Sequence, residues 1–354
     1  MVTRYQAPST PFRGISGSTE VWILDRALRR TLMPVPFRSL EWARLLNDTS
    51  EARAEVPVDD QASLRGLQEW AHGLGVWVNG VPQWWGPVTS VSRGVDDDVI
   101  RIVANDVLAW MRKRWATETL VFQGADLSYI FDALIRNGTS RDNRFGLRSS
   151  TPQTGVPLTR TFRSDDNIFA GLQELSRAGL DFTMALSTLH SGPAQGLFAG
   201  RILANEASFL GRVGVEYDGL AAANSQTTFG GRSGGVEGFT VSGRYEDWDE
   251  RVGLLEQVEI EEAATDADAA LQFSRQRWEI FHDRPRVVTF PPLAPSFPAQ
   301  LSELIPGKTI RFQADDPLFD VAGDYRLTEL RVSVEVAADG SQTDSIQPVL
   351  QVAS

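Results

Sequence analysis

The chain of 354 residues has no cysteine and only three histidines, His72, His190 and His282, which are far apart in the sequence. Without cysteine there is no disulfide framework, no thiolate nucleophile and no cysteine-ligated zinc or iron–sulfur site. Three scattered histidines also argue against a histidine-based metal site. We therefore expect the protein to hold no metal and no cofactor.

Positive charge and long apolar runs are also scarce. Lys and Arg number 34 against 46 Asp and Glu, which gives a net charge of −12. Binding to nucleic acid or anionic lipid depends on cations that neutralise phosphates, so this balance argues against both. No apolar run approaches the roughly 18 residues of a membrane span, and the first residues lack the apolar core of a signal peptide. We expect two or three domains, made inside a cell and not inserted into a membrane.

Most of the negative charge lies between Glu246 and Asp268. This segment contains ten acidic residues and one base, Arg251, so it carries −9 of the net −12. Charge runs are usually solvated surfaces, and this interpretation stays open beside a functional one.

Within the acidic segment, residues 254–261 are expected to form a strand. A period of two places Val258 and Ile260 on one face and Glu259 and Glu261 on the other. Because the apolar pair favours the core, we expect both glutamates to point away from it, toward solvent or a lumen.

The N-terminal region is rich in strand patterns. Alternating or β-branched runs at residues 18–28, 40–48 and 51–59 are separated by turn residues, and a helical pattern follows at 64–74. The clearest local signal is Asn79-Gly80 between two apolar runs, because both central positions of a type I′ hairpin need positive φ. Pro82 then places the second strand at a sheet edge or a bulge.

Two adjacent tryptophans, Trp84 and Trp85, follow on the second strand of that hairpin. Neighbouring residues of a strand point to opposite faces, so one ring must meet something other than its own domain's core. We expect it to contact another subunit, with a further domain or a carbohydrate as the alternatives.

Helical patterns occupy the middle of the chain. Residues 127–137, with Gly138 just past the end, and residues 165–178, with Gly179 as terminator, follow i, i+3, i+4 spacing. Residues 180–187 alternate strictly, which predicts a half-buried strand. Asn105 is expected to cap an earlier helix with the apolar face Val107, Leu108, Met111 and Trp115. The cations in its last turn favour the helix dipole, and we prefer that role to a basic recognition patch: Arg112, Lys113 and Arg114.

From Phe239 onward the chain returns to strand patterns. Thr265 and Asp268 form a capping box for a helix, and prolines between 291 and 298 predict an irregular connector. Strands are expected at 309–314, 325–337 and 345–353. These patterns predict a mainly β, α+β fold with domains at 1–117, 118–238 and 239–354.

One segment matches a catalytic pattern. Gly231-Arg232-Ser233-Gly234-Gly235 fits the loose G-x-S-G-G form around the nucleophile of chymotrypsin-like proteases, where the glycines allow an oxyanion hole. Arg232 stands where that family has Asp, and neither His72 nor His190 lies in a matching motif. We expect Ser233 to be inert and, with no other catalytic motif present, the protein not to be an enzyme.

Several stretches resemble a known family. A hairpin ending in W-G-P-V, followed by strands and by N-D-V-L-A-W-M-R-K-R, resembles the N-terminal part of minor tail proteins of long-tailed phages infecting actinobacteria. The closing stretch G-D-Y-R-L-T-E-L-R-V-S-V-E-V-A-A-D-G resembles their C-terminal part. The order of β-rich, helix-containing and β-rich regions extends this similarity over nearly the whole chain.

The resemblance implies a baseplate-hub-like protein: two β-barrel tube domains that flank an α+β middle region, and a homotrimer whose six barrels continue a sixfold tail tube. It implies a structural role at the distal tail tip of a virion, after synthesis in the host cytoplasm. The implied partners are a distal tail protein, a tape measure protein and other tail-tip or fibre proteins. Genomic DNA would be met only in transit, with Glu259 and Glu261 lining the channel. A carbohydrate-binding virion or cell-surface module is the alternative.

Overall fold

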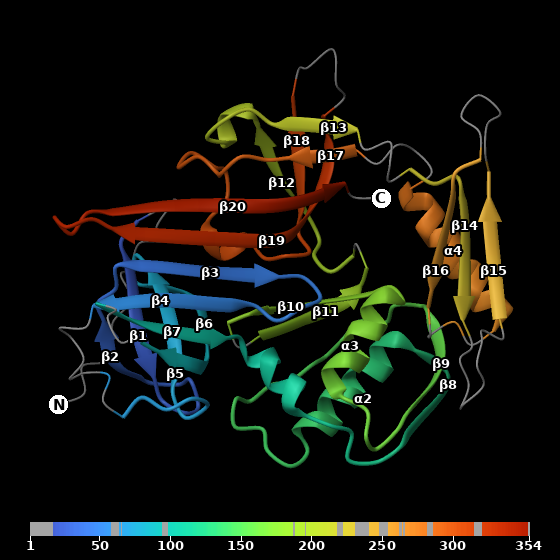
Figure 1. The fold of residues 1–354 in the computed structure, drawn as a ribbon, viewed down its shortest axis with the longest axis horizontal. Coiled ribbons are helices and arrows are strands. Elements are labelled where there is room, and N and C mark those ends of the chain that lie inside the picture. The colour runs from blue at the N-terminus through green and yellow to red at the C-terminus, as the bar shows by residue number, and fades with distance from the viewer. Residues whose placement is uncertain are drawn as a thin grey trace. The chain divides into compact units, whose positions relative to one another are not determined.

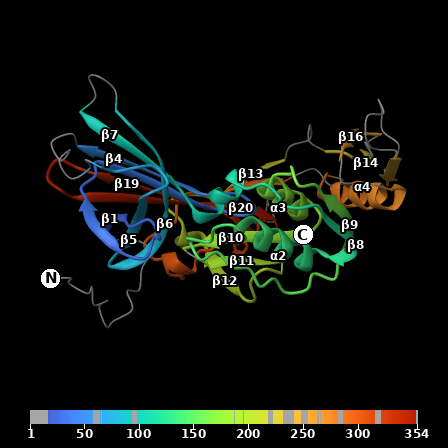
Figure 2. The same cartoon turned by 90° about the horizontal axis from the view of Figure 1, so that it is seen from below.

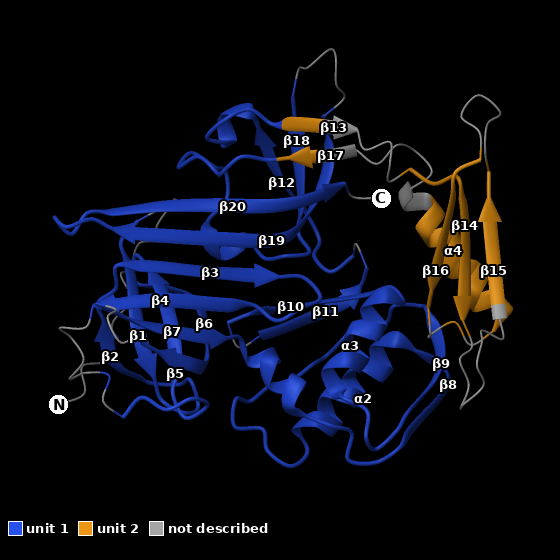
Figure 3. Cartoon of the chain, in the orientation of Figure 1, with its two compact units in different colours: residues 1–213, 290–353 blue, residues 214–289, 354 orange. Residues whose placement is uncertain are grey.

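The computed structural model describes residues 17–57, 64, 66–93, 98–186, 188–194, 196–217, 222–230, 241–247, 254–261, 264, 266–281, 286–314 and 321–352. The chain divides into two compact units, residues 1–213 with 290–353 and residues 214–289 with Ser354, which Figure 3 colours separately. The predicted division at 117/118 and 238/239 stays a prediction.

The first unit contains fifteen of the named strands and two α helices (Figure 1). The strands are β1 (Thr19–Leu24), β2 (Thr31–Val35), β3 (Ser39–Leu45), β4 (Glu51–Pro57), β5 (Gly73–Val78), β6 (Val81–Ser92), β7 (Val99–Asn105), β8 (Leu120–Asp126), β9 (Pro157–Phe162), β10 (Leu180–Ala185), β11 (Thr188–Pro193), β12 (Arg201–Asn205), β18 (Thr309–Gln313), β19 (Gly323–Val336) and β20 (Gln342–Val352). The helices are α2 (Leu127–Thr139) and α3 (Ile168–Arg177), with 3₁₀ helices η2 (Val107–Lys113), η3 (Glu206–Ser208) and η4 (Leu301–Glu303).

One mixed sheet of 11 strands dominates this unit. Its strands pair in the order β12-β18-β19-β3-β4-β7-β6-β5-β1-β2, and β20 pairs with β19. The long β19–β20 hairpin, red in Figure 1, lies beside β3. The mainly β, α+β class predicted from the sequence is confirmed, whereas closure of these strands into two barrels stays a prediction.

Strand β19 joins residues from near both ends of the chain. Its first residues pair with β18, and the residues from Glu329 onward pair with β3. The pairing with β20 shifts register between Leu327 and Glu329, where the change of partner occurs. A bulge bends a strand and increases its twist, so this position lets one strand serve two neighbours in succession.

The Asn79-Gly80 hairpin forms as predicted. Asn79 has φ of 51° and Gly80 of 75°, and Val78 pairs with Val81 across the turn. Pro82 lies in the part of β6 that pairs with β5 alone, next to a register shift, which matches the expected edge position. The helix expected at 64–74 is wrong over its described second half, because residues 66–72 form turns and β5 begins at Gly73.

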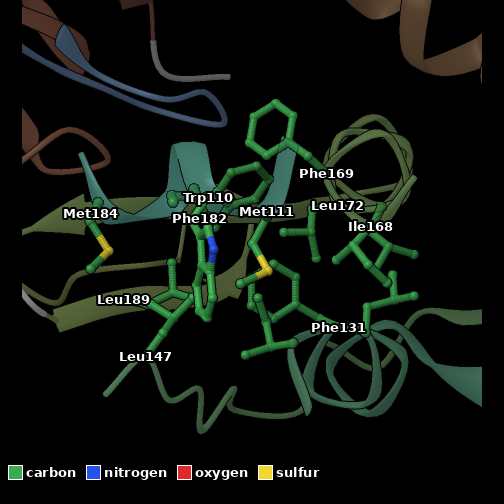
Figure 4. Packing of buried hydrophobic residues seen from close by; sticks show 14 of the residues in the cluster. Trp110, Met111, Phe131, Leu147, Ile168, Phe169, Leu172, Phe182, Met184 and Leu189 are labelled. Atoms are coloured by element: carbon green, nitrogen blue, oxygen red, sulfur yellow. The ribbon is translucent and has the colours of Figure 1, made fainter. Parts of the chain in front are cut away.

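The two helices pack beside the β10–β11 hairpin (Figure 2). Buried rings and aliphatic chains from α2, α3, η2 and β10 form one apolar cluster, shown in Figure 4. Phe182 lies at its centre, with its ring centroid 5.7 Å from that of Phe131 and 6.5 Å from that of Phe169. This cluster fixes the helices against the hairpin.

The starts of η2 and α3 differ from the predicted helix starts by one to three residues. The cap of the first is Asp106 rather than Asn105, since its carboxylate accepts from Leu108 N and Ala109 N. That segment is a 3₁₀ helix, so Trp115 falls beyond its end and is 59% exposed instead of facing the core. Asn167 caps α3 by accepting from Ala170 N, and Gly179 ends it with φ of 111° as expected.

The second unit has two small sheets and one helix. β13 (Gly214–Tyr217) pairs with β17 (Arg286–Thr289), and β14 (Ser225–Gly230) lies between antiparallel β15 (Val241–Glu246) and parallel β16 (Glu256–Ile260). Helix α4 (Ala267–Phe281) packs on β14 and β15. Ser274 Oγ accepts from Thr228 N at 2.9 Å and donates to Gly243 O at 2.8 Å. Gly243 permits this approach, because a Cβ there would lie 2.2 Å from Leu271 N.

The start of α4 includes only part of the predicted capping box among the described residues. Asp266 accepts from Ala269 N at 2.8 Å, which places a carboxylate at the helix start, while Thr265 of the predicted capping box lies outside the described residues. Leu271, in the first half of the helix, is 42% exposed. Within the part of the chain that the structure describes, no helix is both long and apolar enough to cross a membrane.

Candidate functional site

The two adjacent tryptophans point to opposite faces of β6, as predicted. Trp84 is buried, at 3% exposure, and its Nε1 donates to Ser50 Oγ at 3.0 Å. Trp85 is half-buried, with its ring centroid 6.3 Å from that of Trp77. Among the described residues its indole N–H has no hydrogen-bond partner. Trp85 also packs against the apolar cluster of the first unit, so only the exposed part of its ring is left for a partner, and the predicted subunit contact stays a prediction.

A buried carboxylate lies beneath Trp84. Asp106 Oδ2 accepts from both Ser50 N and Ser50 Oγ at 2.7 Å, and Oδ1 accepts from Leu108 N at 3.0 Å. The residue is 3% exposed, and burial raises the pKa of Asp106 to about 6. These hydrogen bonds connect Trp84 on β6, Ser50 just before β4, and Asp106 between β7 and η2.

A buried ion pair joins three segments of the first unit. Arg326 Nη2 on β19 pairs with Asp181 Oδ2 on β10, and Asp181 is 2% exposed. Asn47, in the turn after β3, donates from Nδ2 to Asp181 Oδ1 at 2.9 Å and accepts from Phe182 N at 2.8 Å. Asn47 has φ of 59°, a left-handed conformation that asparagine tolerates better than most residues. The pair fixes β10 to the large sheet.

Arg44 on β3 is a buried cation whose hydrogen-bond partners are neutral oxygens rather than a carboxylate. Its Nη1 donates to Leu301 O at 2.8 Å and Leu304 O at 3.0 Å, and its Nη2 donates to Gln83 O at 2.6 Å. Burial lowers the pKa of Arg44 to about 10. Because three carbonyl oxygens share the cation, Arg44 acts as a cross-link between β3, β6 and η4.

The large sheet also carries a shallow cleft of about 490 Å³ on β3, β4, β19 and β20. Its charged side chains are two acids and two bases: Glu41, Glu51, Arg53 and Arg331. Three of the four are paired: Arg53 with Glu51 at 2.5 Å, and Arg331 with Glu329, which lies outside the cleft lining, at 2.6 Å. A face of balanced, paired charges suits contact with another protein surface more than binding of one small ion.

The faces predicted for β16 are reversed. Val258 and Ile260 are 62% and 56% exposed, whereas Glu261 is 6% exposed. Glu259 is half-buried and pairs with Arg277 of α4 at 2.7 Å. Arg277 of α4 supplies a cation on this face, so Glu259 turns toward it, while Val258 and Ile260 stay exposed. The channel-lining role of Glu259 and Glu261 stays a prediction.

The segment Gly231–Gly235, which contains Ser233, lies outside the described residues, so the expectation that Ser233 is inert stays a prediction. Of the histidines, His72 Nδ1 accepts from Gln68 N at 3.1 Å. His190 lies beside Phe198, with ring centroids 5.1 Å apart, and burial lowers its pKa. Among the described side chains, no three of His, Asp and Glu are grouped as metal ligands.

Sequence comparison gives no match, since neither a family model nor a curated protein matches this chain. Its fold, however, is that of phage tail proteins. The 43 kDa tail protein of prophage MuSo2 from Shewanella oneidensis superposes with a TM-score of 0.65 at 10% identity, over 94% of this chain and 98% of that one. A tail protein from Neisseria meningitidis MC58 gives 0.61 at 13% identity, over 94% and 96%.

The same fold occurs outside phages. The E. coli c3393 protein, a component of the type VI secretion system described as similar to the T4 tail proteins gp27 and gp5, has a TM-score of 0.53 at 12% identity. It covers 94% of this chain and 77% of its own. The sequence-based resemblance to tail proteins is therefore confirmed at the level of the fold, and the actinobacterial host group stays a prediction.

Proposed function

We propose that this chain is a structural virion protein, the tail hub at the distal end of a phage tail. The observation that carries the proposal is the likeness to the MuSo2 tail protein over 94% of this chain and 98% of that one. Agreement over both full lengths concerns the whole architecture rather than a shared module. The gp27-like protein with a TM-score of 0.53 supports the hub position in particular.

In this role the chain forms a homotrimer whose strands continue the tail tube and whose channel serves genome ejection. The partners are a distal tail protein, a tape measure protein and other tail-tip or fibre proteins. The role is non-enzymatic, and the virion belongs to a long-tailed phage of actinobacteria. Strand-rich architecture supports a tube subunit, since its sheets supply both the wall and the subunit contacts.

Trp85 is the proposed anchor of the subunit contact. A half-buried Trp on a sheet edge gains further burial when a partner packs on it, and such residues dominate binding energy at interfaces. Trp85→Ala should still fold, at some cost in stability because Trp85 also packs against the apolar cluster, and should weaken assembly, whereas Trp84→Ala should destabilise the chain more strongly. A Trp85→Ala variant that assembles as well as the parent would remove Trp85 from the interface.

Glu259 and Glu261 remain the proposed channel residues. Because Glu261 is buried, charge reversal is informative at Glu259, whose side chain is partly accessible. Glu259→Lys should slow genome ejection if a negative wall keeps DNA from binding. Glu55→Lys, a reversal of a surface glutamate paired with Arg101 on the large sheet, is the matched control. Equal ejection rates in parent and Glu259→Lys virions would contradict the channel role.

The hub position is tested by labelling virions with antibodies raised against this chain and imaging them. We expect gold at the distal tail tip and at no other place on the particle. Labelling along the tail tube or on the capsid would overturn the proposal, as would virions that lack the protein.

A further inference from the structure

A basic pocket lies where η2 ends, beside the C-terminal end of α2. Its volume is about 270 Å³, and the residues that line it include Lys113, Arg114, Arg141 and Trp115. Among its described lining residues none is acidic, although the chain as a whole carries a net charge of −12. Three cations on one small concavity in an acidic protein form an attractive site for an anion.

The three cations are available to different degrees. Arg114 is held in place, since its guanidinium lies 4.0 Å from the centre of the Trp110 ring and its Nη2 is 3.7 Å from Asp142 Oδ2. Asp142 is shared, because it also pairs with Arg144. Lys113 and Arg141 are exposed and have no ion pair among the described residues. Two cations of the pocket are thus free to bind, beside a third that is fixed.

The surroundings of the pocket are fixed by hydrogen bonds. Thr117 N donates to Asn137 Oδ1 at 2.9 Å, and Asn137 Nδ2 donates back to Thr117 Oγ1 at 3.0 Å. Ala116 N donates to Asp166 O at 2.9 Å. These backbone N–H groups are already used, whereas phosphate sites typically rely on free backbone N–H groups at a helix start.

The exposed ring of Trp115 favours a ligand that has apolar atoms as well as negative charge. The Trp115 side chain is 59% exposed beside the cations, where an isolated inorganic ion has no apolar part to cover the ring. A glutamate or aspartate on a peptide has both a carboxylate for the cations and apolar atoms for the indole. Trp and Arg are also the residues most enriched in protein interfaces.

We propose that this pocket binds a carboxylate side chain of an acidic protein segment, held by Lys113, Arg114 and Arg141 and covered on one side by Trp115. None of the described lining residues belongs to the large sheet, and the site does not depend on the proposed position in a tail. It gives Lys113 and Arg114 a recognition role besides stabilisation of the helix end, whereas Arg112 pairs with Asp48 and does not line the pocket.

The test uses a fluorescein-labelled hexaglutamate peptide, with binding followed by anisotropy at low salt and at 0.15 M salt. We expect Lys113→Gln and Arg141→Gln each to weaken binding about fivefold, as the loss of one partly exposed ion pair predicts. Trp115→Ala should weaken it as well. Arg136→Gln is the matched control, because Arg136 is an exposed cation on α2 that does not line the pocket. Thermal melts of all four variants check that they are folded.

Three outcomes would overturn the proposal. No binding of hexaglutamate by the parent at low salt excludes the site. Equal loss in Arg136→Gln and in the pocket variants indicates general attraction to cations rather than a pocket. Tighter binding of pyrophosphate, with hexaglutamate unable to displace it, makes this a phosphate site instead. The proposal is supported only if the pocket variants lose affinity, the control does not, and pyrophosphate competes more weakly than the peptide.

Discussion

Strands β10 and β16 carry the same kind of sequence alternation, but β10 is buried on both faces whereas the apolar residues of β16 are exposed. In β10 both faces are covered, with Asp181 at 2% and Thr183 at 0% exposure. In β16 the apolar residue Val258 is 62% exposed, while Glu259 pairs with a helix. Alternation therefore divides side chains between two faces but does not determine which face meets a partner. Neighbouring elements that supply hydrogen bonds or cations decide that.

The largest expected effect comes from the apolar face of β10. Phe182→Ala removes a fully buried ring that contacts Phe131 and Phe169, and it should lower the free energy of unfolding by about 3–5 kcal/mol. Chemical denaturation measures the loss. Val258→Ala, at the matching apolar position of β16, should change it by less than about 0.5 kcal/mol. Similar losses for both variants would contradict the difference between the strands.

The polar face of β10 gives the next effect. Asp181→Ala leaves Arg326, whose side chain is only 15% exposed, without its carboxylate and Asn47 without one hydrogen-bond partner, so we expect a loss of about 3 kcal/mol. Glu259→Ala removes the corresponding ion pair of β16, which is partly exposed, and should cost less than about 1 kcal/mol. A double-mutant cycle with Arg326→Met and with Arg277→Met separates the pair energies. Equal coupling energies for the two pairs would contradict the difference in burial between Asp181 and Glu259.

The buried carboxylate of Asp106 makes the free energy of unfolding depend on pH. Its pKa in the folded chain, about 6, lies above the ordinary value of 3.8, so the folded state holds the proton more tightly than the unfolded state. The resulting stabilisation is complete below about pH 4 and is lost as the pH rises through 6. The free energy of unfolding of the parent, relative to Asp106→Asn, should fall by on the order of 2–3 kcal/mol between pH 4 and pH 7. A difference that does not change with pH would contradict the raised pKa.

The smallest effect is expected at the open face of β16. Ile260→Thr exchanges an exposed apolar side chain for a β-branched polar one that keeps strand propensity, so stability should stay within about 0.5 kcal/mol. Thermal denaturation measures it. A loss above 1 kcal/mol would mean that this face is covered in solution.

Local signals in the sequence predicted local structure well. The Asn79-Gly80 hairpin, the apolar face of α2 and the end of α3 at Gly179 follow from turn chemistry and helical spacing within a few residues. What could not be predicted depends on contacts distant in sequence. Asp181 is buried because Asn47 and Arg326 reach it from other strands, and Glu259 turns inward because Arg277 lies on α4.

The candidate sites follow the same rule. The sequence indicated that Trp84 and Trp85 face opposite sides, but the partner of Trp84, Ser50, is 34 positions away and gave no signal. The basic pocket combines the end of η2 with Arg141, which is brought there by the length of α2. Only the cluster Arg112, Lys113 and Arg114 was visible in the sequence, and it is equally typical of a helix end.

The proposal that this chain is a trimeric tail hub is tested most directly by the mass of the assembled protein in solution. Light scattering on the purified chain, across a range of concentrations, should give a species of three times the 39.0 kDa chain mass. Particle images should show threefold symmetry with a central opening. A species that stays at the mass of one chain at every concentration, or a dimer, would contradict the claim.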